Sequence, residues 1–235
     1  MKLVLFDIDG TILLTDGAGR RAIQRALREV FGSAGPEQHR FDGKTDPQIV
    51  REMMRLDGHP DAHIDERMPR LLERYVDYLG EELAAHPAGV RLMPGIRPLL
   101  DALERHEDVL LGLLTGNLAG GARAKLCAAG IEPHRFRVGA YGSDHELRGE
   151  LPAVAQRRAR AEYGVDVAGR NVVVIGDTPA DIACGRSIGA RAIGVATGHY
   201  GVDELRRHGA AAVFADLSDT AAVLDAILSA APVSP

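Results

Sequence analysis

The sequence contains few cysteines and no long run of apolar residues. Two cysteines, Cys127 and Cys184, cannot build a disulfide framework, and this usage is typical of a protein in a reducing cytosol. No apolar stretch approaches the roughly 18 residues that a membrane-spanning helix needs, because charged residues or glycines interrupt each one. The opening residues MKLVLFDIDG turn acidic early and lack the small-residue cleavage site of a secretory signal. We therefore expect a cytoplasmic protein without a membrane partner.

Positive charge is also scarce, and lysine is nearly missing. The chain has 28 lysines and arginines against 33 acidic residues, which gives a formal net charge of −5. A nucleic-acid-binding protein neutralises phosphates with cations, so this balance argues against a nucleic-acid partner. The lysines are Lys2, Lys44 and Lys125, so a reaction that needs an ammonium group has few candidates. With 235 residues, 46% of them hydrophobic, the chain suits one large soluble domain or two smaller ones.

What the sequence does contain is a regular alternation of two kinds of segment. Short apolar runs rich in Val, Ile and Leu indicate strands buried on both faces, at 2–6, 109–114, 136–140, 172–175, 192–195 and 211–214. Stretches with helical periodicity lie between them, at 97–106, 119–129, 151–163, 179–187 and 203–208. This order predicts an α/β fold, a Rossmann-like parallel sheet with helices on both faces. Ligands bind at the carboxyl ends of the strands in such sheets.

The segment from residue 16 to 92 interrupts the alternation. It has no buried-strand run and contains three amphipathic stretches, at 19–31, 47–56 and 65–85. We therefore predict a helical domain over 16–92, called the helical insertion below. The remaining residues form the predicted core domain, which is discontinuous in sequence and comprises 1–15 and 93–235.

The ends of the helical insertion carry turn signals. Glycine or proline occurs in Thr15–Gly19 and in Leu92–Gly95, which we expect to act as hinges. A short loose tail is expected at Ala230–Pro235.

Polar residues follow the first predicted strand directly. Asp7 and Asp9 lie two residues apart, so their carboxylates project on the same side, and Gly10 allows a sharp turn. A solvated turn is the alternative for this motif alone. Its place at a strand end favours a functional site.

The second predicted strand ends in Thr115, Gly116 and Asn117, which supply a hydroxyl and a tight turn. Asn117 could instead cap the helix that follows. Since this strand end belongs to the same sheet edge as Asp7, we expect the two motifs to lie close together.

The fourth predicted strand ends in Gly-Asp-Thr-Pro-Ala-Asp, residues 176–181. Thr178 and Asp181 fit a capping box at the start of a helix, with proline in the first turn. That alternative explains Asp181 and leaves Asp177, at the strand end, without a structural role.

These three strand ends bring several carboxylates to one crevice. Packing carboxylates together is costly unless a cation neutralises them, and an all-oxygen set suits Mg²⁺. A carboxylate beside a divalent ion can attack a phosphoryl group. The Thr115 hydroxyl and the amides of Gly116 and Asn117 would then hold the phosphoryl oxygens.

The ordered motifs Asp-x-Asp-Gly-Thr, Thr-Gly-Asn and Gly-Asp-Thr-x-x-Asp resemble those of the haloacid dehalogenase superfamily. The resemblance covers essentially the whole chain and points to the subfamily of phosphoglycolate phosphatase and β-phosphoglucomutase, which has a helical cap. It implies that Asp7 is a nucleophile that becomes a phosphoaspartate. It also implies that Asp9 is first a general acid and then a base. Dehalogenases of the superfamily lack this second carboxylate, so Asp9 favours a phosphatase or a phosphomutase.

The resemblance further implies a metal site and a phosphate site. Mg²⁺ would bind the side chains of Asp7 and Asp177 and the main-chain carbonyl of Asp9, with Asp181 in a supporting position. Thr115 would bind the phosphate.

The sequence departs from the family pattern at its third motif, normally a lysine between the third strand and the last motif. Lys125 precedes the third predicted strand and is expected to face solvent. We prefer Arg148 as the replacement, because it follows that strand directly and an arginine fork can hold phosphate and carboxylate. The neighbouring arginines are expected on a solvated helix face, namely Arg157, Arg158 and Arg160.

Substrate selection should depend on the helical insertion. Arg20 and Lys44 are candidates to contact an anionic leaving group, with surface solvation as the alternative for each. Thr45 or Asp46 could contact substrate or could cap the helix that begins there.

The sequence thus predicts a Mg²⁺-dependent phosphatase that acts on a small phosphorylated metabolite and is a monomer or weak homodimer. A β-phosphoglucomutase-like phosphoryl transferase is one alternative. A non-enzymatic phospho-acceptor switch is another.

Overall fold

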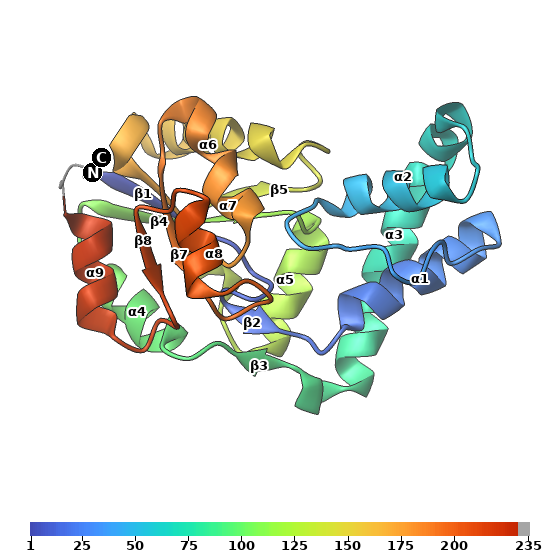
Figure 1. The fold of residues 1–235 in the computed structure, drawn as a ribbon, viewed down its shortest axis with the longest axis horizontal. Coiled ribbons are helices and arrows are strands. Elements are labelled where there is room, and N and C mark those ends of the chain that lie inside the picture. Colours follow the sequence, from blue (N-terminus) through green and yellow to red (C-terminus); the bar gives the residue numbers. More distant parts are fainter. Residues whose placement is uncertain (230–235) are drawn as a thin grey trace.

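A computed structural model describes residues 1–229, and the tail expected at 230–235 lies outside the described residues. Six parallel strands form one sheet in the order β5-β4-β1-β6-β7-β8 (Figure 1). The strands are β1 (Lys2–Phe6), β4 (Val109–Thr115), β5 (Val138–Tyr141), β6 (Val172–Gly176), β7 (Arg191–Val195) and β8 (Ala212–Phe214). The prediction of a parallel α/β core is confirmed.

Helices cover both faces of this sheet. They are α4 (Ile96–Leu103), α5 (Ala119–Ala128), α6 (Leu151–Tyr163), α7 (Pro179–Cys184), α8 (Val202–Arg207) and α9 (Thr220–Leu228). Successive side chains of a strand point to opposite faces. Leu3 and Leu5 of β1 accordingly pack with α6 and α7, whereas Val4 and Phe6 pack with α4, α5 and α9. Both faces of β1 are therefore buried, as its uninterrupted apolar sequence predicts.

The register of the strands brings their carboxyl ends to one edge. Phe6 of β1 pairs with Leu113 of β4 on one side and with Ile175 of β6 on the other. The residues that follow these three positions therefore meet above the same edge of the sheet.

A separate group of helices lies beside that edge, at the right of Figure 1. It comprises α1 (Ala18–Phe31), α2 (Asp46–Leu56) and α3 (Asp61–Ala85), which share a hydrophobic cluster of their own. Ile23, Ala26 and Leu27 of α1 are buried in it, on the face that the amphipathic pattern predicts. We retain 16–92 as the proposed bounds of the helical insertion.

Two short strands connect the helical insertion to the core. Leu13–Leu14 (β2) pairs antiparallel with Arg91–Leu92 (β3), so the chain enters and leaves the insertion side by side. Gly17 and Gly95 begin the helices on either side of this ribbon with φ angles of 77° and 81°. This left-handed backbone favours glycine.

Some bounds differ from the sequence-based expectation. The helix expected at 179–187 ends at Cys184, because a 3-10 turn over Arg186–Ile188 replaces its last turn. The strand expected at 136–140 begins only at Val138, and Phe136 packs edge-on against Phe6. No helix among residues 1–229 combines the length and apolar character that crossing a membrane requires.

Candidate active site

A cavity of about 550 Å³ lies between the carboxyl edge of the sheet and the helical insertion. The core contributes Asp7, Asp9, Thr115, Gly116, Asn117, Arg148 and Asp177 to its lining, and the insertion contributes Arg20, Lys44 and Asp46. Asp181 is buried directly behind this lining. The structure thus gathers the residues singled out in the sequence around one space.

Three carboxylates form a buried cluster at the base of the cavity. Asp7, Asp177 and Asp181 each offer an oxygen, and these atoms lie within 4.8 Å of one another. Burial raises the pKa of Asp7 to about 7 and that of Asp177 to about 9, and neighbouring carboxylates act in the same direction. Such a cluster favours a bound cation, and its all-oxygen donor set fits a hard divalent ion.

Two glycines make room for Asp177. A Cβ atom at Gly10 would lie 2.3 Å from Asp177 Oδ2, and one at Gly198 would lie 1.8 Å from the same atom. Gly10 also has a φ angle of 82°. Any larger residue at either position would displace the carboxylate, so the close approach requires glycine.

Arg148 joins two members of the carboxylate cluster. It begins a 3-10 turn (Arg148–Glu150) after β5, and its Nη2 atom donates to Asp7 Oδ1 at 2.9 Å and contacts Asp181 Oδ1. The side chain is only 7% exposed, so water screens these contacts little. The structure therefore places the arginine preferred from the sequence beside the predicted nucleophile.

The other candidate residues after the third and fourth predicted strands are exposed or make structural contacts. Arg157 and Arg160 are exposed, whereas Arg158 pairs with Asp144 at 2.7 Å. Asp181 accepts hydrogen bonds from the amide and hydroxyl of Thr178, so the predicted capping box is present. Asp181 thus fixes the start of α7 and also binds Arg148.

The expectation that Lys125 faces solvent is wrong. Its side chain lies on the inner face of α5 and is only 5% exposed. The ammonium donates to both Asp9 carboxylate oxygens and to Asn117 Oδ1, each at 2.7 Å. Burying an ammonium is costly unless acceptors surround it, and these three acceptors satisfy it.

Asn117 hydrogen-bonds to Asp9 and Lys125 and does not cap α5. Its Nδ2 group donates to Asp9 Oδ2 at 2.7 Å and to Thr115 Oγ1 at 2.8 Å. The amide at the start of α5, that of Leu118, donates instead to Asp46 of the helical insertion at 2.8 Å. The Asp46 carboxylate, distant in sequence, therefore accepts the hydrogen bond at the start of α5.

The helical insertion meets the strand ends closely at this point. A Cβ atom at Gly116 would lie 2.0 Å from the Lys44 carbonyl oxygen. Thr45 caps α2 by accepting from the Gln48 amide at 3.2 Å, as one of the two alternatives predicts. Asp46 is buried, and burial raises its pKa to about 6.

The two cations expected to contact substrate have partners within the helical insertion. Arg20 donates to the carbonyl oxygens of Glu37 and His39 and lies 3.9 Å from the centre of the Phe41 ring. Lys44 pairs with Glu52 at 2.5 Å. Both side chains nevertheless line the cavity.

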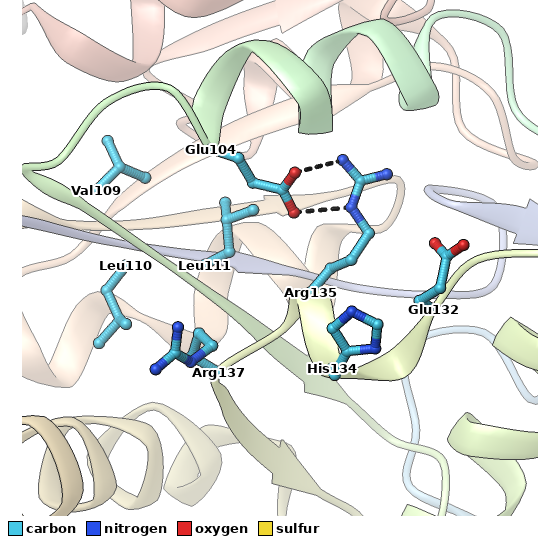
Figure 2. Close-up of a pocket in the computed structure, with 8 residues that line it drawn as sticks. All are labelled: Glu104, Val109, Leu110, Leu111, Glu132, His134, Arg135 and Arg137. Atoms are coloured by element: carbon cyan, nitrogen blue, oxygen red, sulfur yellow. Dashed lines mark hydrogen bonds and ion pairs between the residues drawn. The ribbon is translucent and has the colours of Figure 1, made fainter.

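A second pocket, of about 430 Å³, lies at the amino end of β4 and is shown in Figure 2. Two of its charged groups pair with each other, since Arg135 lies 2.7 Å from Glu104. None of the residues predicted to act in the site lies there, so the cavity at the carboxyl edge is the candidate active site.

Comparison with known proteins shows what the chain is similar to. The model of the haloacid dehalogenase-like hydrolase family matches residues 4–186. The chain is 25% identical over 234 residues to the probable phosphatase IndB of Dickeya dadantii, with 99% of this chain and 98% of that protein covered. It is 26% identical over 217 residues to a phosphoglycolate phosphatase of Cereibacter sphaeroides, covering 89% and 92%. A solved β-phosphoglucomutase of Clostridium difficile has a similar fold, with a TM-score of 0.71, 18% identity and 97% of each chain covered.

The family match spans the three motifs and most of the sheet. The named relatives support the predicted enzyme class, the phosphoric monoester hydrolases. The resemblance seen in the motifs is confirmed, and the chain belongs to the haloacid dehalogenase-like hydrolase family.

Proposed function

We propose that this protein is a Mg²⁺-dependent phosphatase that hydrolyses a small phosphorylated metabolite through a phosphoaspartate at Asp7. One observation carries the proposal: Asp7 is buried at the base of the cavity, between Arg148 and the Asp177 carboxylate, with Asp9 facing the same space. A reactive carboxylate, a cation site and a second carboxylate for proton transfer are the groups that this chemistry needs.

The carboxylate cluster would hold the metal ion. Asp7 and Asp177 would bind it through their side chains, and Asp9 through its main-chain carbonyl, with Asp181 behind them. When bound, Mg²⁺ would neutralise charge and allow an anionic phosphate to approach the anionic Asp7.

The protein residues would carry the bond changes in two steps. In the first, an Asp7 oxygen attacks phosphorus and the bond from phosphorus to the leaving oxygen breaks, while Asp9 donates its proton to that oxygen. In the second, Asp9 takes a proton from water, whose oxygen attacks the aspartyl phosphate and releases inorganic phosphate and the free Asp7 carboxylate.

Groups around these two aspartates would hold the phosphoryl oxygens and the leaving group. Thr115 supplies its hydroxyl, and the turn formed by Gly116 and Asn117 supplies backbone amides. The helical insertion would act as a cap over the cavity, with Arg20 and Lys44 on the side where the leaving group would lie. The phosphoglycolate phosphatase among the relatives favours a small anionic substrate of this kind.

The decisive experiment measures hydrolysis of p-nitrophenyl phosphate with and without Mg²⁺. Asp7→Asn should lower kcat about 10⁴-fold or more, because it removes the nucleophile. Asp203→Asn is the matched control, since Asp203 is an exposed aspartate on α8, and it should leave the rate unchanged. Undiminished activity in Asp7→Asn would contradict the mechanism.

The two alternative functions give different products. A β-phosphoglucomutase-like enzyme would convert a sugar phosphate into its isomer and release little free phosphate. A phospho-acceptor switch would accumulate a long-lived aspartyl phosphate without turnover. Asp9 and the helical insertion favour the phosphatase over the switch, because a phospho-acceptor needs neither a second carboxylate nor a cover over its site.

A further inference from the structure

Lys125 is one of three lysines in the chain, and its side chain is nearly buried. It extends from α5 towards the active-site cavity, where its ammonium contacts both oxygens of Asp9 at 2.7 Å. The Lys125 side chain is 5% exposed, whereas that of Asp9 is 42% exposed. The cation therefore approaches the carboxylate from the protein side and leaves its other side open to the cavity.

The hydrogen bonds around Asp9 restrict how it can act. A carboxylate has about four lone-pair positions, two on each oxygen. Lys125 occupies one on each oxygen, and Asn117 Nδ2 occupies the second on Oδ2. The remaining lone pair belongs to Oδ1, so this is the atom that can exchange a proton with a group in the cavity.

The helical insertion covers the ammonium from the opposite side. A Cβ atom at Gly19 of α1 would lie 3.6 Å from Lys125 Nζ and 3.8 Å from the hydroxyl oxygen of Tyr75 of α3. Tyr75 in turn donates to Asp46 at 3.4 Å. Lys125 is thus held between the strand ends and the insertion, with little room for another rotamer.

We infer that Lys125 is the positioning residue that orients the Asp9 carboxylate, with Oδ1 towards the cavity, for proton transfer to the leaving group. The inference rests on the proposed phosphatase function, in which Asp9 protonates the leaving oxygen. It adds a residue from the helix after the second motif to the groups that control this step.

The test compares two substrates that differ in their need for a proton. The p-nitrophenolate group leaves readily without protonation, whereas the alkoxide of an alkyl phosphate such as glycerol 3-phosphate does not. In Lys125→Met we expect kcat/KM to fall about 100-fold for glycerol 3-phosphate and about tenfold or less for p-nitrophenyl phosphate. The ratio of the two values should therefore fall about tenfold or more.

This ratio separates positioning from a merely structural role. It is measured on one sample, so it does not depend on the fraction of molecules that are folded, and kcat/KM reports the phosphoryl transfer to Asp7. The matched control is Arg123→Met, which removes an exposed cation from the same helix and should leave the ratio unchanged. If Lys125→Met does not fold, Lys125→Arg replaces the compact ammonium by a planar fork and should lower the ratio in the same direction.

The outcomes distinguish the inference from the function on which it rests. If the wild-type protein hydrolyses neither phosphate with Mg²⁺, the proposed function itself is contradicted. If the wild-type protein is active and Lys125→Met or Lys125→Arg loses activity equally on both substrates, or loses none, the positioning role alone is overturned.

Discussion

Two pairs of cations that line the candidate active site differ in their partners. Arg148 and Lys125, on the core side, are nearly buried and contact the carboxylates of Asp7 and Asp9. Arg20 and Lys44, on the side of the helical insertion, are partly exposed and bind groups within the insertion itself. The core cations are therefore held against the two aspartates, whereas the insertion cations are held by groups with which a bound anion would compete.

This difference sets the size of the expected mutational effects. A buried cation removed from between carboxylates leaves uncompensated charge in a poorly solvated place. A partly exposed pair contributes little to the free energy of unfolding because water screens it. Core substitutions should change both activity and stability, and insertion substitutions should change substrate affinity alone.

Among the four cations, the largest effect is expected from Arg148→Met. It removes the guanidinium between Asp7 and Asp181, so kcat for p-nitrophenyl phosphate should fall about 10²- to 10³-fold. Without added metal, the free energy of unfolding should fall by about 3–5 kcal/mol, measured by urea denaturation. Arg158→Met, which breaks a partly exposed pair, is the control and should cost at most about 1 kcal/mol. Activity within twofold of wild type in Arg148→Met would show that the core cations are not special.

A pH titration tests the carboxylate cluster without substrate. In the metal-free folded protein the pKa values of Asp7 and Asp177, about 7 and about 9, lie above the usual value of 3.8 because of burial. The folded state therefore binds more protons than the unfolded state between about pH 4 and about pH 9, so the free energy of unfolding should fall as the pH rises through this range. Mg²⁺ competes with these protons, so it should raise the melting temperature more at the higher pH.

The measurement is thermal unfolding in EDTA and in Mg²⁺ at several pH values. Asp177→Asn removes the aspartate with the higher of the two pKa values, so it should reduce the fall in stability with pH and weaken the response to Mg²⁺. Asp203→Asn should do neither. An unchanged response to Mg²⁺ in Asp177→Asn would place the metal elsewhere.

The core side of the cavity could largely be predicted from the sequence. Asp7, Thr115 and Asp177 each follow a continuous apolar run, and the parallel register brings such strand ends together. The order of the chain therefore indicates that these strand-end side chains share the carboxyl edge. Arg148 is predicted from the family resemblance, which implies a cation between the third strand and the last motif.

Lys125 could not be predicted in the same way, because α5 has no clear apolar face. Its small residues Gly120 and Gly121 face the helical insertion, since a Cβ atom at Gly120 would lie 3.2 Å from Val76 and one at Gly121 would lie 3.3 Å from Leu79. Small residues one turn before Lys125 were the available signal that this face is covered. These small residues predict a covered face only if the helical insertion is known to lie over α5. That placement depends on tertiary contacts such as the one between Asp46 and Leu118.

The smallest effects are expected on the insertion side, where two substitutions should act in opposite directions. Lys44→Met removes a cation from the cavity wall and should raise KM for an anionic substrate such as phosphoglycolate about threefold. Glu52→Gln frees Lys44 from its ion pair and should lower that KM by a similar factor. In both variants kcat should stay within about twofold of wild type, because neither residue contacts Asp7 or Asp9. If the two KM values move in the same direction, Lys44 does not exchange Glu52 for the substrate. The two pairs of cations would then differ in burial alone.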